Sequence, residues 1–194
     1  DLKPLNQFDK KSKPEKFTVL FHSSLRDMKR PILAIKAFKK FLDITEDKDC
    51  IMYISGGGDQ TELKKYLQEN NILDKVKFFG FISIDQKNKL MKESTIMLST
   101  SVKEGWGLIV TEANAMGTPV IAVDVDGLRD AAKASGNKVI DDNSDAIAQA
   151  ILDYQKLFKE HKEKYFEKCR IVLNSAKQIN KQQLINDFNK ILDI

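Results

Sequence analysis

The chain has few of the residues that build disulfide frameworks and metal clusters. Among its 194 residues are two cysteines, two histidines and one tryptophan, and Cys50 lies far from Cys169. A secreted disulfide scaffold would need more cysteines, so both thiols are predicted to be reduced and structural, which favours a cytoplasmic setting. Neither residue type shows the short spacing of metal ligands, and no metal site is predicted.

Long apolar runs and a strong charge of one sign are also lacking. No apolar run approaches the ~20 residues of a membrane span. The formal net charge of +4 suits an anionic ligand or an anionic membrane surface, but it does not require nucleic acid, and no nucleic-acid partner is predicted. A Gly-x-Ser-x-Gly elbow, which would indicate a serine hydrolase, is missing too.

Short apolar segments instead alternate with amphipathic helical patterns along most of the chain. Strands are expected at residues 18–23, 50–55, 76–79, 96–100, 119–123 and 138–140. Helices are expected from Pro31, at 61–70, 86–92 and 127–134, from Ser144 onward, and at 181–192. Strands that are apolar on both faces and alternate with helices indicate an α/β, doubly wound, Rossmann-like parallel sheet of about six strands, in the order 3-2-1-4-5-6. The predicted organisation is a linker-like segment at 1–16, the domain at 17–175, and a C-terminal helix at 176–194.

The most informative segment runs from Glu104 to Glu112 and reads Glu-Gly-Trp-Gly-Leu-Ile-Val-Thr-Glu. A strand, a glycine turn and a helix in succession form an anion site, because free N–H groups and the helix dipole point the same way. Gly105 and Gly107 permit a ligand to approach the backbone closely. Helical side chains lean toward the N-terminus, so the carboxylate of Glu112 reaches back to the turn. A carboxylate, a phosphate cradle and a second carboxylate suit a nucleotide sugar.

With its continuation Gly117-Thr-Pro-Val-Ile-Ala, this segment closely resembles the E-x7-E signature of retaining glycosyltransferases of family four, which have the GT-B fold. The resemblance extends over residues 18–139. It implies the donor-binding half of a metal-independent enzyme that needs no cofactor and transfers a hexose-type sugar from a UDP- or GDP-linked donor. By the same resemblance Glu112 would bind the ribose hydroxyls, Glu104 would face the transferred sugar, and the backbone N–H groups of Gly107 and Leu108 would hold the diphosphate. The turn residues Gly105 and Trp106 are assigned to the donor site with them.

Cations are needed beside the two carboxylates, because a diphosphate adds further negative charge. Lys29 matches a lysine of the family pattern after the first strand, whereas Ser24 occupies the usual arginine position and Arg26 lies two residues further on. Lys29 and Arg26 are therefore assigned catalytic roles together with Glu104. Solvated loop charges are the alternative for Arg26 and, more strongly, for Arg30.

Two further segments resemble donor contacts of the family. In the run 56–59, Gly57 and Gly58 would leave space for the nucleotide, and a simple tight turn is an equal alternative. The backbone at Phe81 and Ile82 would meet the base. His22, at the expected end of the first strand, is interpreted as structural.

The remaining predictions concern partners. Arg129 is expected either to reach the acceptor side or to pair with Asp130. The basic stretch 156–170, with interleaved aromatic residues, indicates a solvated helical face or peripheral contact with the cytosolic face of a membrane. By resemblance the chain is an excised C-terminal half, and its terminal helix would pack on the N-terminal domain through Leu184, Ile185, Phe188 and Ile191. A non-catalytic nucleotide-sugar-binding module and another GT-B enzyme, such as a nucleotide-sugar epimerase, are the alternative functions.

Overall fold

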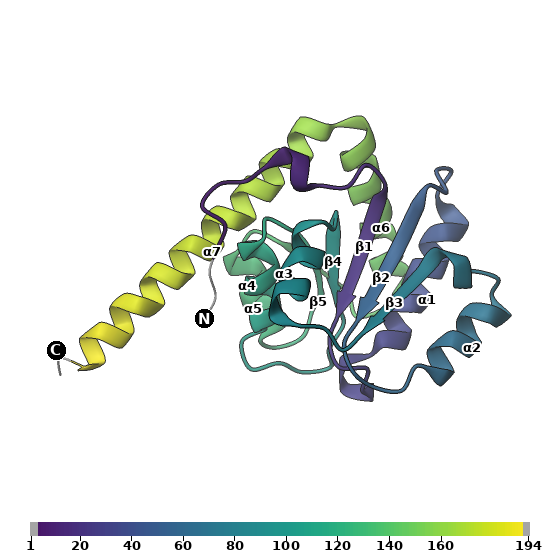
Figure 1. Ribbon diagram of the computed structural model, residues 1–194, viewed down its shortest axis with the longest axis horizontal. Helices are drawn as coiled ribbons and strands as arrows, with labels where there is room; N and C mark the ends of the chain where they lie inside the picture. The colour runs from purple at the N-terminus through teal and green to yellow at the C-terminus, as the bar shows by residue number, and fades with distance from the viewer. Residues whose placement is uncertain (1–3, 192–194) are drawn as a thin grey trace.

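Six parallel strands form the sheet at the centre of the molecule, in the order β3-β2-β1-β4-β5-β6 (Figure 1). The computed structural model describes the backbone of residues 4–191 and the side chains of residues 4–179. The strands are β1 (Phe17–His22), β2 (Cys50–Ser55), β3 (Val76–Gly80), β4 (Ile96–Ser99), β5 (Val120–Val123) and β6 (Lys138–Ile140). The predicted doubly wound sheet and its strand order are confirmed.

Helices follow the strands in turn. They are α1 (Pro31–Ile44), α2 (Thr61–Glu69), α3 (Ile84–Lys92), α4 (Leu108–Ala115), α5 (Leu128–Ala134), α6 (Ser144–Glu160) and α7 (Lys162–Ile191), with 3-10 turns η1 (Lys10–Ser12), η2 (Asp27–Lys29) and η3 (Leu73–Lys75). The pattern placed the start of α3 at Gln86, two residues late. Ser83 and Gln86 form a reciprocal capping box, so the helix begins at Ile84.

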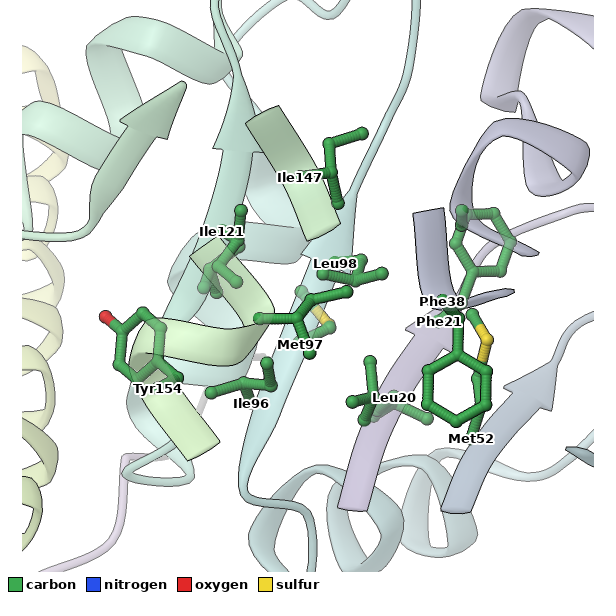
Figure 2. Close-up of a cluster of buried hydrophobic side chains, with 14 of the residues drawn as sticks. Leu20, Phe21, Phe38, Met52, Ile96, Met97, Leu98, Ile121, Ile147 and Tyr154 are labelled. Atoms are coloured by element: carbon green, nitrogen blue, oxygen red, sulfur yellow. The ribbon is translucent and has the colours of Figure 1, made fainter. Parts of the chain in front are cut away.

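The core lies between the sheet and the helices on its two faces. Figure 2 shows Leu20 and Phe21 of β1 and Ile96, Met97 and Leu98 of β4 within it, all at most 2% exposed. Strands that are buried on both sides explain the nearly continuous apolar runs in the sequence. This central pair of strands is the rigid base from which the loops at the carboxyl edge project.

The basic stretch 156–170 gives its aromatic side chains to the core. Phe158 and Tyr165 are fully buried and Phe166 is 7% exposed, so they form no apolar surface for a membrane, and the solvated alternative fits the stretch better. None of the described helices has the length and apolar character needed to cross a bilayer. Residues 181–191 of the helix expected at 181–192 are the last part of α7, which is continuous from Lys162 (Figure 1). Its contacts through Leu184, Ile185, Phe188 and Ile191 lie outside the described side chains.

The N-terminal segment packs on the domain through several contacts. Leu5 N donates to Ala115 O at 2.9 Å, and the rings of Phe8 and Phe166 lie 5.8 Å apart. Lys13 is buried, and its Nζ donates to Thr118 Oγ1 at 2.6 Å and to Ser94 O at 2.9 Å. The part of this segment from residue 4 onward is therefore joined to the fold, which its polar composition did not indicate.

Lys13 is expected to make the stability of the fold depend on pH. Burial lowers its pKa from 10.5 to about 8. The unfolded chain then binds more protons above pH 8, so the free energy of unfolding should rise with pH, by about 1 kcal/mol from pH 7 to pH 9. Urea unfolding of Lys13→Met should lack this rise, whereas the exposed control Lys11→Met should keep it. Parallel pH curves for wild type and Lys13→Met would refute the assignment.

Candidate functional site

The loop after β1 places Lys29 at the carboxyl edge of the sheet. Arg30 adopts the left-handed conformation, with φ 50°, between η2 and α1. Its Nε donates to Thr100 O at 2.6 Å and its Nη2 lies 2.7 Å from Asp142 Oδ1, while Thr100 Oγ1 donates to Lys29 O at 2.9 Å. Arg30 is thus a half-buried structural residue and not a solvated charge. The contacts that it shares with Thr100 hold Lys29 over β4.

Lys29 and Glu104 form an ion pair across this edge. Lys29 Nζ donates to Glu104 Oε1, and Ser101 Oγ donates to the same oxygen at 2.7 Å. The two paired side chains are 24% and 20% exposed. Two of the residues assigned catalytic roles, Lys29 and Glu104, are thus in direct contact.

The glycine turn between the two carboxylates is fitted closely to α5. Gly107 precedes α4 with φ 63°, and a Cβ there would lie 3.1 Å from Gly127 O and 3.3 Å from Ala131 Cβ. Gly107 is thus required by packing of the chain itself. At Gly105, by contrast, a Cβ would meet nothing within 4 Å, so a ligand has open access to the backbone there. Val110 N donates to Gly107 O at 2.8 Å, whereas Leu108 N and Ile109 N have no backbone acceptor among the described residues. Unpaired N–H groups at a helix N-terminus are suited to an anion.

Two adjacent cavities lie along the carboxyl edge. The first, of about 480 Å³, is lined by Lys29, Glu104, Gly105, Trp106, Gly107 and Leu108 among others. The second, of about 390 Å³, is lined by Gly56, Gly57, Phe81, Ile82, Ser83 and Lys87 among others. His22 and Ser23 belong to both linings, so the cavities meet at the end of β1.

Glu112 is held by a residue that the sequence did not single out. Lys87 Nζ, from α3, donates to Glu112 Oε1 at 2.6 Å, and the side chains are 16% and 30% exposed. One signal was available, because Lys87 lies three and four residues before the apolar Leu90 and Met91, on the inward face of its helix. Close by, His22 Nδ1 is 2.8 Å from Ser55 Oγ, and burial together with the charge of Lys87 lowers the pKa of His22.

Three predicted site residues, Arg26, Gly58 and Glu112, are not among the residues that line the two cavities. Arg26 is exposed and its Nε donates to Ser24 Oγ at 3.1 Å. Gly58 packs on Leu25, whose Cβ would be 2.8 Å from an added Cβ. Arg129, which was expected either to reach the acceptor side or to pair with Asp130, pairs instead with Asp124 and Asp126. At the cavity rims Phe81 and Leu108 are 90% and 70% exposed, which leaves two large apolar side chains at the site open to a ligand or partner.

Cation ligands do not gather at this edge. The described residues contain no group of three or more His, Cys, Asp or Glu side chains that could hold a metal ion. The positive charge near the two carboxylates comes from Lys29 and Lys87.

Comparisons with known proteins agree on one family. The sequence profile of that family, described as "Glycosyl transferases group 1", matches residues 3–170. An uncharacterized glycosyltransferase of Methanocaldococcus jannaschii is 32% identical over 136 residues, which cover 69% of this chain and 34% of that protein. The poly(glycerol-phosphate) alpha-glucosyltransferase of Bacillus subtilis is 30% identical over 158 residues, 79% of this chain and 23% of that protein. The chain thus spans about a third or less of these relatives' length.

Among solved structures, HepE of Anabaena in complex with UDP has a TM-score of 0.71 at 18% identity. The likeness covers 96% of this chain and 57% of that one. At this identity it shows a shared fold.

Proposed function

The chain belongs to the glycosyl transferases group 1 family, and we propose that it forms the donor-binding half of a retaining, metal-independent GT-B enzyme of family four. The donor is a UDP- or GDP-linked sugar of the hexose type. The relative from Bacillus subtilis is named as a glucosyltransferase, which supports a hexose-type sugar. The structural neighbour HepE was crystallised with UDP, which supports a nucleotide-linked donor.

The observation that carries the proposal is the order of groups along the two cavities. Phe81 and Ile82 line the second cavity, where the base would stack, and Lys87 links that cavity to Glu112, which would bind the ribose. The N-terminus of α4 would hold the diphosphate. Glu104, in the first cavity, would then face the sugar. From the second cavity to the first, these groups would thus contact the nucleoside, the diphosphate and the sugar of one ligand in that order.

Charge balance explains how the site would stabilise a departing diphosphate. Glu104 and Glu112 are each already paired with one lysine, so the net charge of the two ion pairs is zero. The charge of the diphosphate must therefore be met by the N–H groups of α4, by the remaining donor protons of Lys29, and by a rearranged Arg26. These donors would accelerate sugar transfer most if they face the diphosphate oxygen that gains negative charge as the bond to the sugar breaks.

Sugar transfer would also need groups from outside this chain. We propose that the acceptor pocket and the rest of the catalytic cleft are supplied by the N-terminal domain of the same protein. The chain by itself would then bind the donor without transferring sugar. Cys50 and Cys169 are buried and free, which supports a cytoplasmic setting for the protein.

Isothermal titration calorimetry with UDP and GDP tests the proposed donor site. At least one of them should bind this chain with the same affinity in buffer and in EDTA, because lysines and the helix N-terminus replace a metal ion. Uridine, which lacks the diphosphate, should bind much more weakly. Absence of binding for both nucleotides would refute the donor site, and binding that is lost in EDTA would refute its independence of metals.

A further inference from the structure

The Lys87–Glu112 pair joins the consecutive helices α3 and α4 across the strand between them. Lys87 extends from α3, which follows β3, and Glu112 lies in the second turn of α4, which follows β4. At 16% exposure the lysine side chain is more buried than lysines usually are, and a buried ammonium needs a partner. Its ion pair with Glu112 Oε1, at 2.6 Å, supplies one.

This contact determines how the Glu112 carboxylate is presented. A glutamate side chain has three rotatable bonds, and ordering it costs conformational entropy. Anchoring Oε1 orients the carboxylate before any ligand arrives. Within the described part of the chain no side chain donates a hydrogen bond to Oε2, so that oxygen is left to accept one from a ligand.

The pair also lies beside the second cavity, although Glu112 itself is not among the residues that line either cavity. Lys87 lines the second cavity, and His22 lines both. The pKa of His22 is lowered by burial and by Lys87 and raised by Glu112, as expected if all three side chains are close together. A nucleotide that spans both cavities must pass the point beside His22 where they meet, and in the proposed function the ribose lies there.

We infer that Lys87 is a positioning residue that orients Glu112 toward the two ribose hydroxyls, and that the site thereby selects ribonucleotides over nucleotides without these hydroxyls. The inference rests on the proposed function. Lys87 acts through Glu112, so its loss should remove the benefit of the hydroxyls and leave the contacts to the diphosphate in place.

The test compares UDP and GDP with their 2′,3′-dideoxy analogues by calorimetry on this chain. Wild type should bind the ribonucleotide at least about tenfold more tightly, as expected for hydrogen bonds to a charged group. In Lys87→Met the preference should fall below about threefold, mainly through weaker binding of the ribonucleotide. Glu112→Gln should lose the preference similarly, and Lys87→Arg, which keeps a cation, should retain it.

Lys89→Met is the matched control, because Lys89 is an exposed lysine of the same helix. This variant loses the same charge and should keep the wild-type preference. A Lys87→Met variant that weakens both nucleotides equally would show that Lys87 contacts another part of the ligand, and an unchanged preference would show no role in ribose selection. Either result overturns the inference while the donor site stands. Failure of wild type to bind any of the four nucleotides overturns both.

Discussion

Replacing Gly56 by alanine should destabilise the fold by about 3–5 kcal/mol, because backbone strain and a steric clash add at one position. Gly56 has φ +127°, and a Cβ there would lie 1.8 Å from the carbonyl oxygen of Ser23. Its N–H donates to Gly80 O at 2.7 Å, so the residue ties together the ends of β1, β2 and β3. Urea unfolding monitored by circular dichroism measures the loss.

Alanine substitutions at two other glycines separate the effect of backbone strain from that of the steric clash. Gly80 has φ +64° with nothing within 4 Å of an added Cβ, so Gly80→Ala should cost only about 1–2 kcal/mol of strain. Gly105 has neither a positive φ nor a close neighbour, and Gly105→Ala should change stability by less than about 1 kcal/mol. Gly105→Ala should nevertheless weaken nucleotide binding if a ligand approaches this backbone. Equal stability losses at all three positions would contradict the packing described at Gly56.

Replacing Lys29 by methionine should weaken binding of UDP or GDP by about 10- to 100-fold. The variant loses a donor for the diphosphate and also leaves Glu104 without its cation beside the ligand. Glu104→Gln should act in the opposite direction and tighten nucleotide binding by a few-fold, because it removes a nearby negative charge and releases Lys29. Calorimetry at a fixed, low salt concentration measures both effects.

The double variant tests whether the two residues act on one ligand group. Lys29→Met with Glu104→Gln should bind the nucleotide more tightly than Lys29→Met alone, because the unpaired carboxylate is gone. Lys103→Met is the control, because it removes an exposed positive charge from the same loop as Glu104. Its nucleotide affinity should stay within about twofold of the wild-type value. If Lys29→Met binds the nucleotide with wild-type affinity, the diphosphate does not lie beside Lys29.

Much of the fold could be predicted because its signals are local. The apolar runs at Leu20 and Ile96 indicated strands buried on both faces, and the alternation with helices indicated the parallel sheet and its strand order. The apolar pattern does not reflect the capping box at Ser83 and therefore predicts the start of α3 two residues late. The boundary predicted between residues 175 and 176 lies inside α7, so one continuous helix joins the two predicted segments.

The sheet, the glycine turn from Glu104 to Glu112 and the family resemblance could be inferred from the amino-acid sequence, because each depends on residues that are near neighbours in the chain. The pairing of charged side chains could not be inferred in this way, because it depends on how distant segments pack. Lys29 reaches Glu104 over 75 positions and Lys87 reaches Glu112 over 25, while Arg26 stays exposed and Arg30 becomes structural. These pairings arise because parallel strands bring the loops of β1, β3 and β4 to one edge, and the rotation of each helix there then selects which side chain faces inward.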